Sequence, residues 1–396
     1  MKHIVYLHQY FRVPSQGGST RSYWIARALV DEGYKVTMVT SGDADGDSKY
    51  EFIDGIHVVR LKVPYDQKMS VFRRFRSFFD FMVRSTIYSL FLKDVDMVFV
   101  TSTPLSIGIP ALMLKWLRRI PYIFEVRDLW PRVPIEMGMI TNTALKKTLV
   151  YLEYLVYKNA LEIVALSPGM EQGVKECCPK AKVSMIPNMS KVDIFYPRRK
   201  DQSLIDRLGL SRDSFKVIHF GSIGRANGIE NILSNLEICN SDKLVEFVFV
   251  GGGSEEERLK KQCKDKGLRN VFFLGAYSLS DTSNIVNLCD VSLVSFANIP
   301  VLYTNSPNKL FDSLSAGKAI IVNSAGWTKD LVENYHCGLY VDPDSPEDLI
   351  HSIELLASDK ALLGRMEENS IHLAQTKFDK EILCSQVVGI FNRYLN

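Results

Sequence analysis

The chain has 396 residues, of which 46% are hydrophobic and 23% charged, and its formal net charge is +3. This length favours two domains over one, and the nearly balanced charge argues against nucleic acid as a partner. The seven cysteines form no C-x-x-C pair and no uninterrupted apolar run reaches 18 residues, so we expect reduced thiols in a cytoplasmic protein without a signal peptide or transmembrane helix.

The first predicted elements are a strand, a loop, a helix and a second strand, over residues 4–7, 9–19, 20–32 and 34–40. This order is typical of the β-α-β unit of Rossmann-like domains. Gly17 and Gly18 precede the helix, where glycine lets the backbone approach a phosphate or a sugar closely. A tight turn that requires positive φ is the alternative, because the full G-x-G-x-x-G pattern is absent.

Two acidic patterns resemble metal-binding loops. Asp43, Asp45 and Asp47 alternate as in a calcium loop, but the glutamate of its twelfth position is missing. Asp342 and Asp344 flank a proline just before a predicted helix. We interpret both patterns as turn and capping segments, and we predict no metal site.

Residues 69–93 predict a basic amphipathic helix. At 100° per residue, one face carries Phe72, Phe75, Phe78, Phe79 and Met82, and the opposite face carries Arg73, Arg76 and Arg84. Such a helix can lie in the headgroup region of a membrane, with its aromatic rings inserted and its arginines on anionic lipid. Packing of the aromatic face into the core, with the basic face in solvent, is the alternative.

Further strands are predicted at 56–60, 96–102, 122–125, 162–166 and 183–186, and Ser167-Pro168-Gly169 is predicted to form a turn. Arg127 and Asp128 directly follow one of these strands, and ligands of open α/β sheets bind at such carboxyl ends. We expect Arg127 to neutralise phosphate charge and Asp128 to orient it or to contact a hydroxyl. A purely structural pair of these two residues is the alternative.

Residues 187–200 are rich in proline, polar and charged residues, as is typical of a linker. A second β-α-β series follows, in which the strand at 215–220 runs into the loop at 221–228. The glycines and the arginine of this loop, Gly221, Gly224 and Arg225 among them, are suited to cradle a diphosphate. Because the carboxyl ends of parallel strands meet at one edge, later loops with Gly251, Gly252 and Tyr277 are expected nearby.

The stretch 306–321 predicts a loop, a helix and a buried strand. Ser306 is the expected N-cap of the helix, and Lys309 in its first turn opposes the helix dipole unless an anion lies nearby. Asp312, one turn further on, is placed to accept hydrogen bonds from sugar hydroxyls. An ordinary helix–strand unit with a surface lysine and a surface aspartate is the alternative.

Together these motifs resemble those of a known family. The pattern Gly17-Gly18…Arg21, the segments EVRDLWP at 125–131 and GSIGRANG at 221–228, and SPNKLFD at 306–312 with Ala316-Gly317 are similar to GT-B glycosyltransferases of family four. The resemblance extends to a bacterial surface-polysaccharide branch, which includes enzymes resembling the N-acetyl-L-fucosamine transferase of O-antigen synthesis. It covers the whole chain.

The resemblance implies an α/β fold of the GT-B type, with two Rossmann-like domains and a cleft between them. We expect an acceptor-binding domain at 1–190, a nucleotide-sugar-binding domain at 191–376 and a C-terminal helix at 377–396, for which a return to the first domain is left open. The resemblance also implies transfer with retention of anomeric configuration and without a metal or other cofactor.

The family's E-x7-E motif falls on Thr304 and Asp312, so only its second, ribose-binding carboxylate is retained. The resemblance implies that backbone N–H groups near Asn308 and Leu310 replace the missing first glutamate. The histidine that many members place after a first-domain strand falls on Arg127.

The family's phosphate-binding arginine and lysine fall on Ser222 and Asn227. We propose Arg225 and Lys309 as their replacements. The predicted catalytic residues are therefore Arg127, Asp128, Arg225 and Lys309. The predicted donor-binding residues are Gly17, Gly18, Gly221, Ser222, Gly224, Gly251, Gly252, Tyr277, Ser306, Asn308, Leu310 and Asp312.

The resemblance predicts a retaining glycosyltransferase that moves a sugar from a nucleoside diphosphate to a polyprenyl-diphosphate-linked saccharide. UDP and an N-acetylated amino-sugar are the preferred donor parts. We expect the enzyme at the inner face of the cytoplasmic membrane, in peripheral contact through residues 69–93. A nucleotide-sugar 2-epimerase of the same fold, which needs no acceptor, and a non-catalytic nucleotide-sugar-binding subunit are the alternatives.

Overall fold

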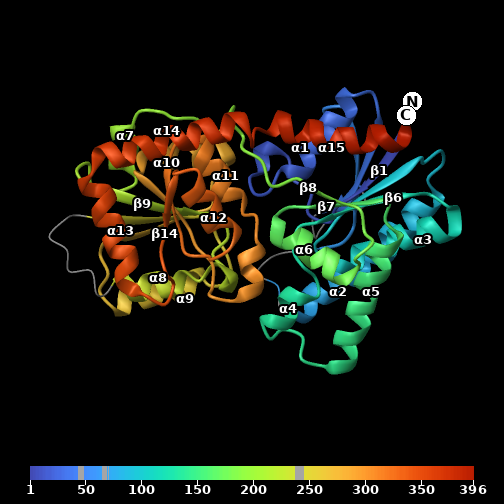
Figure 1. Ribbon diagram of the computed structural model, residues 1–396, viewed down its shortest axis with the longest axis horizontal. Coiled ribbons are helices and arrows are strands. Elements are labelled where there is room, and N and C mark those ends of the chain that lie inside the picture. The colour runs from blue at the N-terminus through green and yellow to red at the C-terminus, as the bar shows by residue number, and fades with distance from the viewer. Residues whose placement is uncertain (43–48, 65–68, 70, 237–244) are drawn as a thin grey trace. The chain divides into compact units, whose positions relative to one another are not determined.

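In the computed structural model, the chain divides into two compact units (Figure 1). The structure describes residues 1–42, 49–64, 69, 71–236 and 245–396. Unit 1 comprises Met1–Val13, Ser19–Pro187 and Glu381–Asn396, and unit 2 comprises Pro14–Gly18 and Asn188–Lys380. The acidic pattern at 43–47 lies outside the described residues.

Unit 1 is built on an eight-stranded sheet with the order β3-β4-β2-β1-β5-β6-β7-β8. Every neighbouring pair is parallel except β3 and β4. The strands are β1 His3–Leu7, β2 Lys35–Ser41, β3 Lys49–Ile53, β4 Ile56–Leu61, β5 Met97–Thr101, β6 Tyr122–Val126, β7 Glu162–Ala165 and β8 Val183–Met185. The central strands β1, β5 and β6 are buried along their whole length, which agrees with their continuous apolar sequences.

The edge strand β3 was not predicted, although the Asp54-Gly55 dipeptide that joins it to β4 is a strong hairpin signal. The other predicted strands of this unit agree with the structure to within two residues at each end. The predicted turn at Ser167-Pro168-Gly169 is wrong. Ser167 caps helix α6, Pro168–Cys177, by accepting a 3.1 Å hydrogen bond from the N–H of Met170, and Pro168 occupies the first helical position.

The remaining helices of unit 1 are α1 Arg21–Asp31, α2 Val71–Phe91, α3 Gly108–Arg118, α4 Arg132–Glu136, α5 Thr143–Asn159 and most of α15, Lys380–Leu395. Helix α15 returns to this unit at the end of the chain. The ring of Phe391 meets that of Phe99 on β5 at 5.3 Å between centroids, and Arg393 forms a 2.6 Å ion pair with Glu162.

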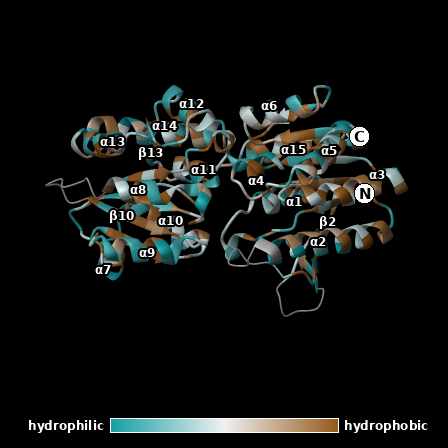
Figure 2. Ribbon diagram, turned by 90° about the horizontal axis from the view of Figure 1, so that it is seen from below, coloured by the Kyte–Doolittle hydropathy of each residue, from teal (hydrophilic) through white to brown (hydrophobic). Residues whose placement is uncertain are grey.

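Helix α2 carries hydrophilic and hydrophobic residues along its length (Figure 2). Its buried side is formed by four residues at four-residue spacing, Ser77, Phe81, Ser85 and Ser89. Small side chains let a neighbouring helix approach closely, and α2 packs on α3. Phe75 and Phe79 of the predicted aromatic face are 39% and 63% exposed, so these two rings do not belong to the core. No helix within the described ranges is both long and apolar enough to span a membrane.

Unit 2 is built on a six-stranded parallel sheet with the order β11-β10-β9-β12-β13-β14. The strands are β9 Phe215–Phe220, β10 Val245–Val250, β11 Val271–Gly275, β12 Val291–Val294, β13 Ala319–Val322 and β14 Gly338–Tyr340. The helices are α7 Gln202–Arg207, α8 Ile229–Leu236, α9 Glu256–Asp265, α10 Leu279–Leu288, α11 Asn308–Ser315, α12 Trp327–Asn334, α13 Pro346–Ser358 and α14 Lys360–Thr376.

Apolar side chains cover both faces of this sheet. One core cluster joins the strands to α8, α9 and α13, and a second joins them to α7 and α10. Both units are therefore Rossmann-like, and the predicted α/β fold with two such sheets is confirmed.

Candidate functional site

The loops that follow β9 and β10 lie side by side at the carboxyl edge of the unit 2 sheet. The N–H of Gly221 donates to the carbonyl of Val250 at 2.8 Å, and the N–H of Ile223 donates to that of Gly252 at 3.0 Å. Gly251 has φ +133°, and a Cβ there would lie 1.9 Å from the carbonyl oxygen of Gly221. Only glycine allows this approach, so Gly251 has a structural reason to be glycine whether or not it touches a ligand.

Lys309, in the first turn of α11, lies beneath the first of these loops. Its side chain is buried, and a Cβ on Gly221 would lie 3.5 Å from its Cε. Its Nζ is 2.9 Å from Nε2 of His219 on β9 and 3.1 Å from Oδ1 of Asn227 in the glycine loop. Burial lowers the pKa of Lys309 to about 7.

A hydrogen-bond chain holds the partners of this lysine. The hydroxyl of Ser295 donates to the backbone carbonyl of Asn227 at 2.9 Å and lies 3.3 Å from Nδ1 of His219. Because that hydroxyl hydrogen is used, its oxygen is left to accept from Nδ1–H, which makes Nε2 an acceptor for Lys309. Burial, together with the nearby Lys309, keeps the pKa of His219 well below its usual value, so the imidazole is neutral.

The start of helix α11 differs from the prediction. Pro307, not Ser306, is the N-cap, and the helix begins at Asn308 without a side-chain cap. The Oγ of Ser306 instead accepts from the N–H of Asn188 at 3.2 Å. The N–H of Leu310 donates to the carbonyl of Pro307 at 3.1 Å, so this N–H is already engaged within the turn.

Asp312 is also buried, and it forms a 2.5 Å ion pair with Lys191 of the linker. Both side chains are less than one tenth exposed. Burial raises the pKa of Asp312, although the ion pair with Lys191 opposes the rise. Asp312, which the resemblance predicts to bind the ribose, is therefore paired with Lys191 of its own unit. The sequence analysis did not predict this ion pair.

Arg225 and Ser222 of the glycine loop are exposed to solvent. Arg225 begins the short 3₁₀ turn Arg225–Asn227. No described residue forms an ion pair with it, so its guanidinium remains available to an anion. The loop therefore carries an exposed arginine, and its Asn227 contacts the buried Lys309 of α11.

The glycine pair of the first half lies against unit 2. Pro14–Gly18 groups with that unit, and a Cβ on Gly17, which has φ +70°, would lie 3.1 Å from the carbonyl oxygen of Tyr277. The side chain of Tyr277 is 39% exposed. Gly17 and Tyr277, both predicted donor-binding residues, are therefore neighbours.

Arg127 and Asp128 lie in unit 1 and have separate partners. The Arg127 guanidinium donates to Oγ of Ser19 at 2.7 Å, whereas Asp128 accepts from the hydroxyl of Thr103 at 3.0 Å. Burial raises the pKa of Asp128, against the effects of Thr103 and Arg127. The two side chains are therefore held by Ser19 and Thr103, and not by a hydrogen bond to each other.

Arg21, part of the G-G-x-x-R pattern, lies in the interior of unit 1. It forms a 2.8 Å ion pair with Glu125, and both side chains are fully buried. It also donates to the carbonyls of Ile186 and Pro187 at the end of this unit. We infer that Arg21 ties the first helix to the segment that leads into the linker.

The predicted site residues thus form separate groups. Gly221, Lys309 and Asn227 are in contact, with Arg225 in the same loop. Gly18 and Gly224 lie next to members of these groups in sequence, and Asn308 and Asp312 lie on the same helix as Lys309. His219 and Lys191 were missed, because a histidine inside an apolar strand and a lysine in a linker carry no local signal of a site.

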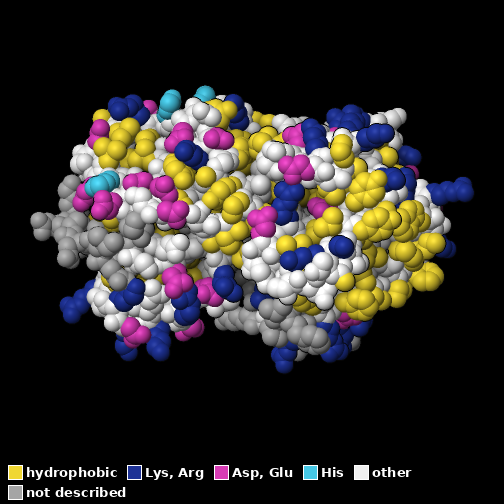
Figure 3. Space-filling model, turned by 60° about the horizontal axis from the view of Figure 1, so that its bottom comes forward, with side chains coloured by type: hydrophobic (Ala, Val, Ile, Leu, Met, Phe, Trp, Pro, Cys, Tyr) yellow, Lys and Arg dark blue, Asp and Glu magenta, His cyan; other side chains and the backbone are white. Residues whose placement is uncertain are grey.

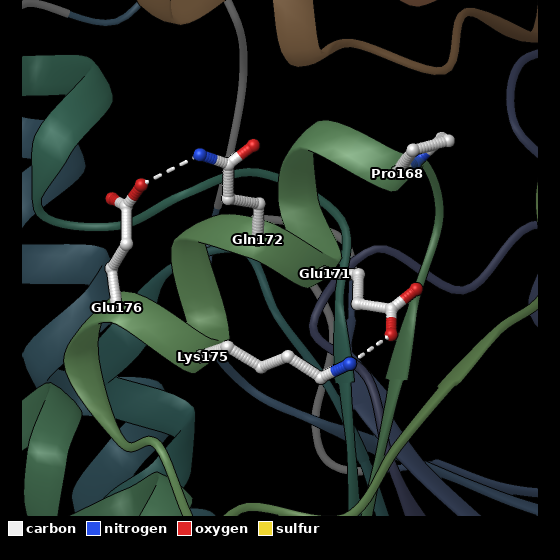
Figure 4. Close-up of a pocket in the computed structure, with 5 residues that line it drawn as sticks. All are labelled: Pro168, Glu171, Gln172, Lys175 and Glu176. Carbon is white, nitrogen blue, oxygen red and sulfur yellow. Dashed lines mark hydrogen bonds and ion pairs between the residues drawn. The ribbon is translucent and has the colours of Figure 1, made fainter.

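A surface hollow lies elsewhere, along α6 of unit 1 (Figure 4). It is lined by one face of that helix, Pro168, Glu171, Gln172, Lys175 and Glu176. Lys175 pairs with Glu171 at 2.5 Å, and Gln172 donates to Glu176 at 3.0 Å. None of these side chains was predicted as a site residue, and their charges are already paired, so we assign the hollow no ligand.

Family models match both halves of the chain. The model described as "Glycosyl transferase 4-like domain" matches residues 16–189, and the one described as "Glycosyl transferases group 1" matches residues 201–373. Together they account for most of the chain.

Curated relatives are distant. The chain is 23% identical over 275 residues, 68% of each chain, to WbjE of Pseudomonas aeruginosa, described as a probable glycosyltransferase. It is 20% identical over 375 residues to the uncharacterized glycosyltransferase MJ1607 of Methanocaldococcus jannaschii, covering 93% of this chain and 92% of the relative.

Solved structures share the fold at low identity. Sucrose-phosphate synthase from Thermosynechococcus elongatus superposes with a TM-score of 0.81 at 17% identity over 99% of both chains. HepE of Anabaena, solved in complex with UDP-glucose, gives a TM-score of 0.72 at 16% identity over 99% of this chain and all of that chain. WaaG, a glycosyltransferase involved in lipopolysaccharide biosynthesis, gives a TM-score of 0.70 at 15% identity over 98% of this chain and 99% of that chain.

Proposed function

The chain belongs to the group 1 glycosyltransferases, and from that premise we propose that it transfers a sugar, with retention, from UDP to a polyprenyl-diphosphate-linked saccharide. The sugar is an N-acetylated amino-sugar, and the product contributes to a bacterial surface polysaccharide. The observation that carries the proposal is the contact of Lys309 with Asn227 beneath the glycine loop.

The chemistry of transfer explains why that contact matters. Cleavage of the glycosyl–phosphate bond develops positive charge at the anomeric carbon and negative charge on the departing diphosphate. Lys309, the exposed Arg225 and the N-terminus of α11 are donors that the fold holds at the same sheet edge, so they stabilise the departing charge without reorganisation. A preorganised donor of this kind supplies about 3 kcal/mol of transition-state stabilisation.

The choice of UDP rests on the fold and on the resemblance. HepE, which has the same fold, was solved with UDP-glucose, and a UDP moiety carries the diphosphate that the glycine loop is suited to hold. The amino-sugar and the surface-polysaccharide pathway rest on the motif resemblance alone. WaaG, of the same fold, acts in lipopolysaccharide biosynthesis, which supports a polysaccharide role.

Unit 1 offers a surface suited to a membrane that carries the acceptor. Apolar side chains gather on the surface of this unit in the space-filling view (Figure 3). Exposed apolar residues lie on α2, β3 and α3, namely Phe75, Phe79, Ile87, Phe91, Tyr50, Phe52, Trp116 and Leu117. These elements adjoin, because Tyr50 meets the ring of Tyr88 on α2 and Arg118 donates to the carbonyl of Leu90.

Helix α2 also exposes arginines, on the face opposite Phe75 and Phe79. Arg73, Arg76 and Arg84 are all solvent-exposed, and of these three, within the described part of the chain, Arg84 alone forms an ion pair, with Asp80 at 2.7 Å. Exposed aromatic rings beside arginines are the combination that inserts into an anionic membrane surface. We therefore place the enzyme, as part of the proposal, on the cytoplasmic face of the membrane through residues 69–93.

The proposal is tested by incubating the purified enzyme with a panel of nucleotide sugars and a polyprenyl-diphosphate-linked saccharide. We expect transfer from one UDP-linked amino-sugar, with the anomeric configuration retained in the product. Transfer from a GDP- or dTDP-linked donor only would overturn the choice of UDP. Conversion of the nucleotide sugar without any acceptor would instead indicate an epimerase.

A further inference from the structure

Lys309 carries a buried amine whose hydrogen-bond partners in the structure have no charge. Its hydrogen-bond partners are the imidazole of His219 and the side-chain amide of Asn227, which are both uncharged. The carboxylate of Asp312, on the same helix, is paired with Lys191. Among the residues that the structure describes, no carboxylate forms an ion pair with Lys309.

Burial without a counter-ion destabilises the protonated form of the Lys309 amine relative to the neutral form. A buried ammonium without a counter-ion is expensive, and the usual outcome is that the group gives up its proton. Burial alone accounts for the lowered pKa of about 7, and no neighbouring charge raises it. In the ligand-free protein the amine is therefore mostly neutral above that pH.

The hydrogen bonds of Lys309 are compatible with both forms. A neutral amine has two hydrogens, which it donates to Nε2 of His219 and to Oδ1 of Asn227. The remaining position on the nitrogen holds a lone pair in the neutral form and a third N–H in the protonated form. Protonation therefore adds one donor without breaking either existing hydrogen bond.

The position of Lys309 below the glycine loop indicates that the third N–H donates to an anion bound at this loop. Gly221 lies above it, and Gly221 and Ser222 are exposed to solvent, so an anion can reach this loop from outside. An anion beside the amine supplies the missing counter-charge and stabilises the protonated form. The ligand of this loop under the proposed function is a nucleoside diphosphate.

We propose that Lys309 is largely neutral in the empty enzyme and takes up one proton from solvent when a nucleoside diphosphate binds. The lone pair of Nζ accepts the proton, and no bond of the ligand breaks. The inference rests on the proposed function for the identity of the ligand. It adds that donor binding is coupled to proton uptake, so affinity falls as the pH rises above neutrality.

Other charged groups near the lysine do not account for such uptake. His219 faces Lys309 from β9 and remains neutral, since its pKa lies well below the range concerned. Arg225 in the loop carries a guanidinium, which has no free lone pair to accept a further proton. Asp312 and Lys191, one turn along α11 and in the linker, are paired with each other.

Calorimetric titration of the enzyme with UDP tests the inference. At about pH 8 the terminal phosphate of UDP is already ionised, because its second pKa is about 6. The binding enthalpy is measured in two buffers of different ionisation enthalpy, and the difference gives the number of protons exchanged. We expect nearly one proton taken up per UDP by the wild-type enzyme.

Two variants sharpen the result. Lys309→Arg carries a permanent charge, so it should bind UDP with no proton uptake. Lys329→Arg makes the same change at a lysine of unit 2 that lies over the ring of Tyr340, and it should behave as wild type. If Lys309→Arg does not fold, the pH profile of the wild type serves instead, and we expect UDP affinity to weaken about tenfold per pH unit between pH 7.5 and 9.

The outcomes separate the two proposals. UDP binding without proton uptake, at an affinity that does not vary with pH in this range, overturns the inference and leaves the proposed function standing. Proton uptake that persists in Lys309→Arg also overturns it, because another group would be the acceptor. Failure of UDP and of other nucleoside diphosphates to bind at all overturns both.

Discussion

Nζ of Lys309 lies 3.1 Å from Oδ1 of Asn227. Asn227 stands where the resemblance places a phosphate-binding lysine, and the amine that contacts it comes from a residue 82 positions further along the chain. This contact agrees with the proposal that Lys309 replaces the missing cation. The motif resemblance predicts the replacement, but it does not predict the contact between the two side chains. The contact becomes visible because β9 and α11 bring both side chains to the same end of the sheet.

Removal of the Lys309 amine should impair catalysis more than folding. We expect Lys309→Met to lower kcat/KM by about 100-fold or more, since loss of one preorganised donor to a developing anion costs about 3 kcal/mol. Lys329→Met is the matched control and should retain wild-type rates. Steady-state kinetics, with circular dichroism to verify folding, measures the effect. Equal rates for both variants would remove Lys309 from the site.

Arg225 should also matter for turnover and hardly at all for stability. It is exposed and makes no ion pair with a described residue, so Arg225→Ala should leave the melting temperature nearly unchanged. We expect at least a tenfold loss of kcat/KM, because the guanidinium would no longer neutralise the diphosphate. Arg269→Ala, at another arginine of unit 2, is a suitable comparison, and a similar loss there would argue against a specific role.

The free energy of unfolding of the wild type should depend on pH differently from that of Lys309→Met. Between its pKa of about 7 in the folded state and its usual 10.5, the unfolded chain binds the proton and the folded one does not. The free energy of unfolding of the wild type should therefore rise with pH in this window, relative to Lys309→Met, by up to about 1.4 kcal/mol per pH unit. Chemical denaturation of both proteins at several pH values measures the difference. A constant difference would mean that the amine keeps its proton.

The Lys191–Asp312 ion pair should be strongly coupled. Because both groups are buried, Lys191→Met should cost about 3–5 kcal/mol by leaving an unpaired carboxylate inside the protein. The double variant Lys191→Met with Asp312→Leu should recover much of this loss. Denaturant titrations of the single and double variants complete the cycle, and additive losses would contradict a coupled pair.

Exposed rings on α2 should control membrane binding. Phe75→Ser with Phe79→Ser should shift the protein from pellet to supernatant when it is sedimented with vesicles of phosphatidylglycerol and phosphatidylethanolamine. Leu355→Ser replaces a side chain of unit 2 that is 44% exposed and should have no effect. Unchanged sedimentation of the double variant would count against docking through this helix.

Much of the architecture was predictable because parallel strands buried on both faces are short apolar runs. The strand β9, Phe215–Phe220, has the predicted bounds. The edge strand β3 was missed because it is exposed and lacks such a run, with Tyr50 and Phe52 facing solvent. Helix α6 was read as a turn because Ser-Pro-Gly also begins helices when the serine serves as N-cap.

The site was predictable only in part. The glycine loop and Lys309 have local signals, which are the strand-to-helix turn and a cation in a first helical turn. Their contact depends on the tertiary packing of β9 and α11, as does the burial that lowers the pKa of the amine. The partners His219 and Lys191 lie 90 and 121 residues from Lys309 and Asp312, at distances that local patterns do not encode.

The most direct test of the central claim, that the glycine loop and Lys309 hold the diphosphate of the donor, is thermal unfolding with and without UDP. At a UDP concentration about 100 times its Kd, binding to the folded state adds about 2.7 kcal/mol to the free energy of unfolding. We predict this protection for the wild type and for Lys329→Met, and its loss at the same UDP concentration in Lys309→Met. Equal protection of all three proteins would contradict the account.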